Sequence, residues 1–332
     1  MNGSSAYTSW RFWAGLFISA LFVFLVLHNV KWPEVGAAWK SARWGGLAAG
    51  LLLIVAAWGL GAVRWRVLLA PAPGLRVRDT FAYITIGYLA NTVLPLRLGE
   101  VARATLIGRK KRLGVARALG SIAVERVFDL LTVSALVLLL ALVMEIPPVV
   151  QAGLISASGL AVTALAVLVV LSLNQAKLQR RIRWLSKWMP GSLAPRVQAL
   201  VDGFAGGAGA VKSLARLAAV AALSAAMWML AGLATLAWVR AFNLATPWFA
   251  GYFVLAAVNL GSAIPSSPGY IGVYHYMAVV ALSFWVPDRG PALAYAIGTH
   301  ALNVLANAGL GGFFLVREGV HLNEFTTGEA VP

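Results

Sequence analysis

Five residues within one short stretch of an otherwise apolar chain combine helix breakers with charges. They are Pro95, Arg97, Gly99, Glu100 and Arg103. Glu100 and Arg103 are three residues apart, so they can pair on a helix that follows Gly99. One interpretation is that these charges lie on the inner membrane surface beside a short helix. We favour a functional role, because the break is expected to point into the bilayer, where ionised groups are costly and usually functional.

Three further charges, Glu125, Arg126 and Asp129, interrupt a later apolar run. Glu125 and Asp129 share one helix face at spacing i, i+4, and Arg126 reaches Asp129 at i, i+3. Inside a bilayer such groups need neutralising partners, for which Arg97 and Arg103 are the candidates. A structural ion cluster that holds the first break against this helix is the alternative, and it is compatible with substrate contact.

A second break follows a short apolar run in the other half of the chain. It contains Pro265, Ser266, Ser267, Pro268 and Gly269. Both breaks carry Pro-x3-Gly and have an asparagine upstream, Asn91 or Asn259. Paired breaks in corresponding positions of two halves indicate the binding site of a transporter. Ser266 or Ser267 can cap a following helix, whose N-terminus would attract a lipid phosphate. A simple turn is the alternative.

The last apolar segment carries a polar stripe. His300, Asn303 and Asn307 follow the spacing i, i+3, i+7, which places them on one helix face that we expect to point to the protein interior. His275 follows the second break. Histidines in apolar helices are more often hydrogen-bonded packing residues than proton carriers, so packing is the expected role and proton transfer the alternative.

The composition is that of a polytopic α-helical membrane protein. Apolar residues make up 60% of the 332 residues and charged residues 11%, against about 45–50% and about 25% in soluble domains. Runs with few or no charges, such as residues 12–27, 47–63 and 160–173, supply with their flanks the roughly 20 residues that a spanning helix needs.

Several chemistries are excluded by what the chain lacks. It has no cysteine, so it forms no disulfide and no cysteine-ligated metal site. It has no phosphate-binding loop motif, no histidine-rich metal motif and no Ser-His-Asp set. The first outer loop, residues 31–43, has only one acid, Glu34, where a multi-span glycosyltransferase is expected to carry acidic residues. We therefore expect no cofactor, no metal, no catalytic residue and no enzyme activity.

The net charge of +16 indicates membrane orientation and not nucleic-acid binding. Lysine and arginine cluster in a few connections between apolar runs, as the positive-inside rule predicts. With both termini in the cytoplasm, 21 of the 27 basic residues lie inside and five outside, while Arg126 lies within a helix. Arg64, after the second apolar run, is counted among the inside charges. The first apolar segment lacks a small-residue cleavage site, so we expect it to remain as a membrane helix.

The predicted fold is all-α and forms one transmembrane domain, residues 1–332, with about six spanning helices and two broken or re-entrant segments. The spanning helices are expected at residues 12–30, 44–63, 118–143, 151–173, 214–239 and 291–316. The first broken segment, around residues 80–98, must enter and leave on one side, because basic residues flank it on both ends. The second, residues 247–286, either spans twice or is re-entrant.

The chain divides into two halves, about 44–145 and 214–316. They begin on opposite sides of the membrane, as an inverted-topology repeat requires, so such a repeat stays open. A basic cytoplasmic loop, residues 174–213, joins them. Residues 177–195 within it are typical of an interfacial amphipathic segment, and the glycine-rich residues 203–209 predict a flexible break.

The broken and charged segments resemble a known family. Asn91–Arg103, Glu125–Asp129 and Pro265–Gly272, in this order, are similar to motifs of the lysylphosphatidylglycerol synthase transmembrane-region family, and the resemblance extends over about residues 10–316. It implies a bacterial or archaeal inner-membrane protein that moves a lipid between leaflets. Aminoacyl-lipid members add a soluble synthase domain, which we do not expect here because the chain ends first. Many relatives have a glutamate shortly after the second break, where this chain has Tyr274-His275.

The combined prediction is a lipid flippase or transporter that moves an anionic or polyprenyl-linked lipid between the leaflets of the inner membrane. Membrane lipids are the expected partners, nucleic acid is not, and a homodimer or a cytoplasmic synthase partner stays open. The alternatives are a membrane enzyme with Glu100 or Asp129 as general base, and a non-transporting scaffold for a lipid or envelope synthase. The residues expected to bind substrate are Asn91, Pro95, Arg97, Gly99, Glu100, Arg103, Glu125, Arg126, Asp129, Asn259, Pro265, Ser266, Ser267, Pro268, Gly269, His275, His300 and Asn303.

Overall fold

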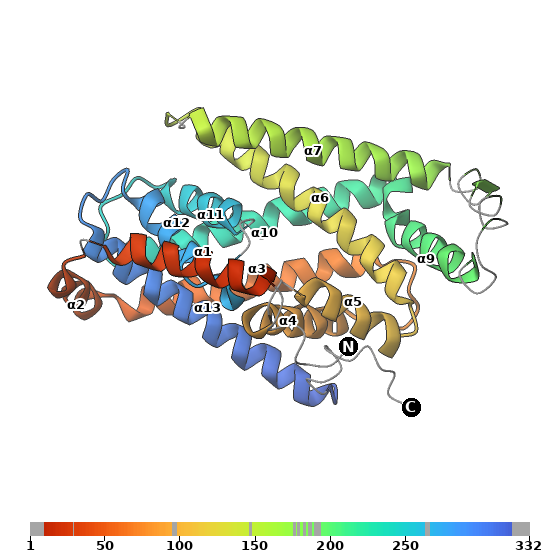
Figure 1. Ribbon diagram of the computed structural model, residues 1–332, viewed down its shortest axis with the longest axis horizontal. Helices are drawn as coiled ribbons and strands as arrows, with labels where there is room; N and C mark the ends of the chain where they lie inside the picture. The colour runs from red at the N-terminus through yellow and green to blue at the C-terminus, as the bar shows by residue number, and fades with distance from the viewer. Residues whose placement is uncertain are drawn as a thin grey trace. The chain divides into compact units, whose positions relative to one another are not determined.

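A computed structural model gives the fold of the chain (Figure 1). It describes residues 10–28, 30–94, 98–145, 148–174, 194–262 and 266–320, together with residues 177, 180, 181, 184 and 188. In chain order the helices are α1 (Trp10–Leu27), α2 (Trp32–Ser41), α3 (Trp44–Leu68), α4 (Val77–Val93), α5 (Gly99–Lys110), α6 (Val115–Leu140), α7 (Pro148–Leu173), α9 (Ala194–Gly207), α10 (Leu214–Ala241), α11 (Ala250–Gly261), α12 (Val273–Leu282) and α13 (Arg289–Arg317), with short 3-10 turns at Ala208–Lys212 (η3) and Pro268–Tyr270 (η4). The all-α prediction is confirmed for this part of the chain.

Several helices have the length and composition of membrane spans. Among the described residues, α3, α10 and α13 are each long and apolar enough to cross a bilayer. A fourth span results if Leu16–Leu27 and Trp32–Ser41, whose directions differ by 85°, are taken together. Large apolar side chains lie on the surface, such as Leu52 at 72% and Leu305 at 67% exposure. Helices that satisfy their own backbone and turn apolar side chains outward suit a lipid environment.

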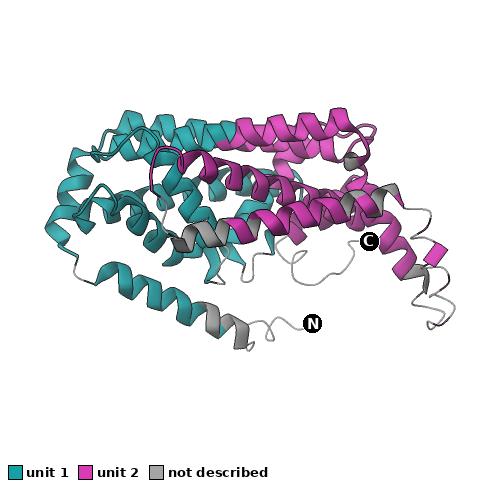
Figure 2. Cartoon of the chain, turned by 90° about the horizontal axis from the view of Figure 1, so that it is seen from above, with its two compact units in different colours: residues 1–57, 85–99, 229–332 teal, residues 58–84, 100–228 magenta. Residues whose placement is uncertain are grey.

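The chain forms two compact units (Figure 2). Unit 1 contains residues 1–57, 85–99 and 229–332, and unit 2 contains residues 58–84 and 100–228. In unit 1, α12 packs against α1, α11 and α13, and α13 packs against α2. In unit 2, α6 packs against α7 and α9. The helices α3, α4 and α10 each contribute one part to each unit.

Each predicted spanning segment lies on a helix of the structure, and the largest difference in length concerns α3. This helix runs to Leu68, whereas the predicted helix ends at residue 63. Arg64 and Arg66 therefore lie on the last turns of a helix and not in a connection. The apolar run stops at the first arginine, so composition alone places the end of the helix too early.

The glycine-rich stretch 203–209 is not a flexible break, contrary to the prediction. α9 extends through Gly207 and continues directly into η3. A Cβ added to Gly203 would lie 2.7 Å from the Cβ of Ala116, and one added to Gly207 would collide with the carbonyl of Arg117. These glycines permit close packing against α6, which local composition does not distinguish from flexibility. Most of the predicted interfacial segment 177–195 lies outside the described residues.

The connection that was predicted to be the first outer loop contains a helix, because residues 32–41 form α2. Pro33 lies in its first turn, where a missing N–H costs no intrahelical hydrogen bond. Val35 and Ala38 are buried, and α2 packs against α13. Contacts with a distant part of the chain therefore stabilise this short helix. Its own sequence does not predict a helix.

Candidate functional site

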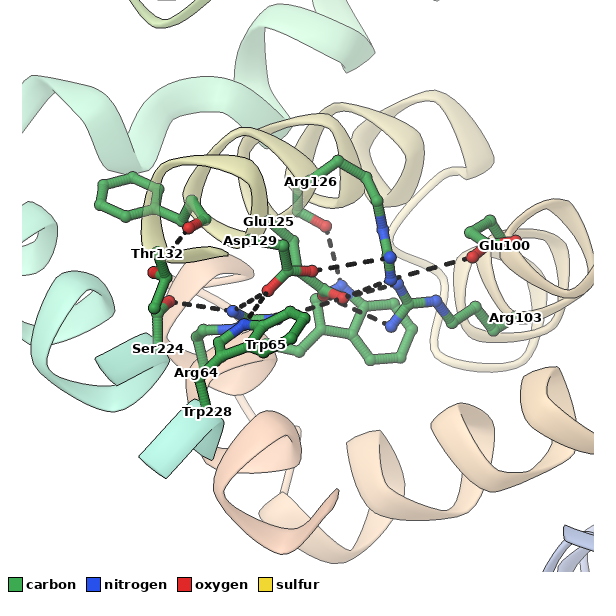
Figure 3. Close-up of polar contacts among 12 residues, drawn as sticks. Arg64, Trp65, Glu100, Arg103, Glu125, Arg126, Asp129, Thr132, Ser224 and Trp228 are labelled. Carbon is green, nitrogen blue, oxygen red and sulfur yellow. Dashed lines mark hydrogen bonds and ion pairs between the residues drawn. The ribbon is translucent and has the colours of Figure 1, made fainter. Parts of the chain in front are cut away.

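Six charged side chains of unit 2 form one network, which we call the ionic cluster (Figure 3). They are Arg64, Glu100, Arg103, Glu125, Arg126 and Asp129. Three guanidinium groups face three carboxylates, so the formal charges balance within the cluster. The prediction that Glu125, Arg126 and Asp129 find partners outside α6 is therefore correct for Arg103.

Glu125 lies at the centre of the ionic cluster. Its Oε1 atom is 2.8 Å from Arg103 Nη2, 3.2 Å from Arg126 Nη2 and 3.4 Å from Arg64 Nη2. Arg103 Nη1 also donates to Glu125 Oε2 at 3.3 Å, which makes this pair bidentate. Because the Glu125 side chain is only 4% exposed, these charge-assisted bonds replace the water that a carboxylate otherwise requires.

Asp129 forms the second anionic centre, one helical turn further along α6. Arg64 Nη1 donates to its Oδ1 at 2.6 Å, and Trp228 Nε1 donates to the same atom at 3.3 Å. Arg126 Nη1 lies 3.6 Å from Asp129 Oδ2, so the predicted i, i+3 contact is confirmed. Ser224 Oγ accepts a further bond from Arg64 Nη1 at 2.9 Å. α3, α6 and α10 thus meet at this carboxylate.

Arg64 is the largest correction to the predicted site. It was expected among the inner-surface charges, yet its side chain is 2% exposed and contacts both acids of α6. Its Nε atom is buried and has no hydrogen-bond partner among the described residues. The prediction for Arg64 is wrong for the same reason as the predicted end of α3. In composition alone, an arginine that follows an apolar run marks the end of a membrane helix. Two acids on one face of α6 were the available signal that a further cation was needed.

Glu100 and Arg103 do not form the predicted pair. Arg103 is bound by Glu125, while Glu100 Oε1 lies 3.8 Å from Arg126 Nη2. Arg97, the other expected partner of the acids, lies outside the described residues, as does Pro95. Glu100 and Arg103, three residues apart on α5, therefore contact two different residues of α6.

Exposure increases from one side of the ionic cluster to the other. The side chains of Arg64, Arg103 and Glu125 are at most 5% exposed, whereas Glu100 is 32% and Arg126 48% exposed. The buried members can contact only each other and their protein neighbours. Arg126 and Glu100 form the open edge, which is where a ligand from outside could reach the network.

The acids lie in the central part of α6. Glu125 is ten residues after the first residue of the helix and 15 before the last, which corresponds to about 15 Å and about 22 Å along the axis. A carboxylate buried in the middle of a helix is stable only with compensating charges. The ionic cluster therefore has a structural role whatever else it does.

Trp65 supports the buried side of the ionic cluster, and its replacement gives a first prediction. The side chain is fully buried, its Nε1 donates to Ser121 Oγ at 3.0 Å, and Arg103 Cζ lies 4.7 Å from the ring centroid. Trp65→Phe removes the donor and weakens the cation–π contact, so we expect a loss of about 1–3 kcal/mol in the free energy of unfolding. Denaturant titration in detergent measures it. Trp44→Phe, at a 69% exposed site on the same helix, should change stability by less than about 0.5 kcal/mol.

The first break turns the chain back toward α4 within unit 1. The backbone N–H of Gly99 donates to Asn91 Oδ1 at 2.8 Å. A Cβ on Gly99 would collide with the carbonyl of Gly87, so the first residue of α5 packs directly on the backbone of α4. Asn91 and Gly99, both predicted site residues, thus define the geometry of this turn.

The second break is held by two histidines. The carbonyl of Gly269 accepts a bond from His300 Nε2 at 2.8 Å, and the N–H of Gly272 donates to His275 Nδ1 at 3.3 Å. Gly269 and Gly272 have φ values of 70° and 87°, in the left-handed region that favours glycine. His275 therefore supplies the contact at the start of α12 that was predicted for Ser266 or Ser267.

The serines and prolines of the second break have other roles. Ser267 precedes η4 without a side-chain capping bond, and its N–H donates to Ser19 Oγ at 2.7 Å. Pro268 is the first residue of η4. The Oγ atom of Ser266 is buried and has no hydrogen-bond partner within the described part of the chain. Pro265 lies outside that part.

The two breaks lie beside each other in unit 1. A Cβ added to Gly269 would be 3.5 Å from the carbonyl oxygen of Thr92, the second-last residue of α4. Asn307 of α13 donates to Thr92 Oγ1 at 3.3 Å. The predicted stripe on α13 thus contacts both breaks, through His300 at one and Asn307 at the other. This agrees with the expectation that the two broken segments meet.

Two predicted site asparagines, Asn303 and Asn259, donate hydrogen bonds within their own helices. Asn303 Nδ2 donates to Thr299 O at 2.9 Å, and Asn259 Nδ2 donates to Leu255 O at 2.8 Å. Both bonds return to a carbonyl one turn earlier on the same helix, so neither side chain joins the breaks through them. Within the described residues, no group of three or more His, Cys, Asp or Glu could hold a metal ion.

Fold and site together define an integral, multi-pass helical membrane protein with a buried charged network around α6. The chain belongs to the lysylphosphatidylglycerol synthase transmembrane-region family, whose model matches residues 12–311. The resemblance drawn from the sequence motifs is thereby confirmed.

Two curated relatives are similar to this chain. Glycosyltransferase AglD of Haloferax volcanii is 24% identical over 323 residues, which cover 87% of this chain and 51% of AglD. UPF0104 membrane protein MJ1078 of Methanocaldococcus jannaschii is 26% identical over 207 residues, which cover 62% of this chain and 84% of MJ1078. The chain thus spans about half the length of AglD. No solved structure matches it.

Proposed function

We propose that the protein is a lipid flippase or transporter of the inner membrane that moves an anionic or polyprenyl-linked lipid between leaflets. Membrane lipids are its substrate, and the polypeptide carries out no covalent chemistry. In this proposal about six helices span the bilayer, both termini are cytoplasmic, and the first broken segment is re-entrant. The second broken segment, residues 247–286, either spans twice or is re-entrant. A homodimer or a cytoplasmic synthase as partner is compatible with it.

The open edge of the ionic cluster is the observation that carries this proposal. Arg126 and Glu100 are partly exposed, yet they are continuous with buried charges in the central part of a membrane helix. Such a group is expected to serve a pathway for a polar or charged substrate. Arg126 is the best placed to meet a headgroup phosphate, because Arg64 and Arg103 are buried against the acids. The two breaks of unit 1 add the feature expected of a transporter.

Replacing Arg126 tests the proposal and gives the second prediction. Arg126→Ala should slow lipid translocation at least tenfold, because the headgroup loses its exposed cation. Stability should change by less than about 1 kcal/mol, since a partly exposed ion pair contributes little and Glu125 keeps two arginines. The measurement is leaflet accessibility of labelled phosphatidylglycerol or polyprenyl phosphate in vesicles with purified protein.

A matched control separates the cluster from general charge effects. Arg240→Ala removes one exposed arginine from α10 and should leave the rate within twofold of the wild type. Equal rates for the wild type and Arg126→Ala, with active wild type, would rule out the assigned role of Arg126. Vesicles in which the wild-type protein moves no lipid would favour the scaffold alternative.

A membrane enzyme is the second candidate, favoured by the similarity to AglD, which is named a glycosyltransferase. In that case Glu100 is the better general base, because Asp129 accepts bonds from Arg64 and Trp228. The same vesicles, supplied with nucleotide sugars, distinguish the two. A change in lipid mass that is lost in Glu100→Gln would support the enzyme, whereas translocation at constant lipid mass would support the transporter.

A further inference from the structure

A second group of arginines in unit 2 surrounds the connection between α3 and α4. Arg117 of α6 donates through Nη2 to the carbonyls of Leu69 at 3.0 Å and Pro71 at 2.5 Å. Arg216 of α10 donates through Nη1 to the carbonyl between them, that of Ala70, at 3.1 Å. Two guanidinium groups from different helices therefore lie against three consecutive peptide groups.

A third arginine binds the other end of the same connection. Arg66 of α3 donates through Nε to the carbonyl of Leu75 at 2.6 Å and through Nη2 to that of Ala72 at 3.4 Å. We call Arg66, Arg117 and Arg216 the arginine clamp. The side chains of the clamp donate to neutral carbonyl oxygens, which satisfy hydrogen bonds but cancel no charge.

The arginine clamp has no acidic partner within the described residues. Asp79, at the start of α4, is bound instead by Lys111 Nζ at 2.9 Å and by the N–H of Arg76. The negative end of the α3 dipole amounts to roughly half an elementary charge, against three positive charges. The clamp therefore differs from the ionic cluster, in which every arginine faces a carboxylate.

The clamp retains capacity for a further ligand. A guanidinium has five N–H donors, whereas the bonds to the connection use one nitrogen each of Arg117 and Arg216. Both residues are only partly buried, so they can be reached from outside. Forked donors of this kind match the oxygens of phosphate.

The position of the clamp favours a lipid as the source of that phosphate. α3 has 25 residues, a length of about 37 Å, which exceeds the roughly 30 Å of the hydrocarbon core. The end of α3, where the clamp lies, is then expected at the level of the lipid headgroups. Phosphodiester groups are concentrated at that depth.

We infer that the arginine clamp binds the phosphate of an anionic membrane lipid beside the connection between α3 and α4. This site is separate from the ionic cluster and does not require that the protein transports lipid. Lipid bound there would offset part of the positive charge of the clamp and hold α3, α6 and α10 together at one end of unit 2.

The test measures binding of phosphatidylglycerol to the purified full chain in a neutral detergent, by native mass spectrometry. Arg117→Gln and Arg216→Gln should each weaken binding about tenfold, because one charged fork is lost while the amide still donates to the connection. Arg112→Gln is the matched control. Arg112 is exposed and lies in the same unit, and this substitution changes the net charge by the same amount. It should stay within twofold of the wild type.

Four outcomes would overturn the inference. Equal weakening in Arg112→Gln would indicate diffuse attraction, and unchanged binding in both clamp variants would mean that the arginines only hold the connection. Displacement of the lipid by excess inorganic phosphate would indicate a site for a soluble anion. The displacement experiment uses the wild-type protein, so it decides even if a variant fails to fold. Equal binding of phosphatidylcholine would also contradict selection of an anionic lipid.

Discussion

Glu125→Gln is expected to lower the free energy of unfolding by about 3–5 kcal/mol, because it leaves buried guanidinium groups without their shared counter-charge. Arg64 and Arg103 both contact Glu125 Oε1, and neither is more than 5% exposed. Water therefore cannot replace the lost carboxylate. The measurement is denaturant unfolding in detergent, followed by tryptophan fluorescence.

Two controls test this explanation. Glu100→Gln removes the same charge at the open edge of the ionic cluster, where the ion pair is longer and partly exposed, so its effect should stay below about 1 kcal/mol. The double variant Glu125→Gln with Arg103→Gln restores a balanced cluster and should recover part of the loss. If the double variant loses as much unfolding free energy as the two single variants added together, charge balance is not the cause.

Gly99→Ala is expected to disrupt the first break, at a cost of about 1–3 kcal/mol or more. The added methyl group would collide with the carbonyl of Gly87 and would lie 2.6 Å from Asn91 Oδ1, the acceptor of the Gly99 N–H. Neither neighbour can move freely, since one is helix backbone and the other already binds this residue. Unfolding in detergent measures the cost, and the translocation assay should show a parallel loss.

The same substitution elsewhere should have the opposite sign. Gly59 lies within α3, and an added Cβ there meets no atom within 4 Å. Gly59→Ala should therefore stabilise the protein by roughly 0.5–1 kcal/mol, because alanine loses less conformational freedom on forming a helix. Equal and small effects at Gly59 and Gly99 would show that the close approach at the first break is not rigid.

Helix content and the main site residues could be predicted from the sequence. Apolar runs located the long helices, because their signal is local. The i, i+4 acids of α6 and the two Pro-x3-Gly breaks were recognisable for the same reason. α2 and α9 were missed, because packing against α13 and α6 holds them and this information is not in the segment itself.

Partners distant in the chain could not be predicted. Arg64 was placed on the surface, although it pairs with residues more than 60 positions away. The capping contact at the second break was assigned to serine, whereas His275 makes it. Local sequence shows that a charge or a helix end needs a partner, but only the packing of helices selects which side chain provides it.

The order of synthesis gives Arg64 a further importance. Asp129 follows it by 65 residues, so at 5–20 residues per second the ribosome adds this acid about 3–13 s later. During that interval the nascent α3 must be accommodated in the bilayer with an uncompensated arginine. Arg64 lies one turn from the last residue of α3, where a long basic side chain can reach the polar interface until its counter-ions emerge. The position of Arg64 near the end of α3 is therefore expected to lower the cost of inserting this helix.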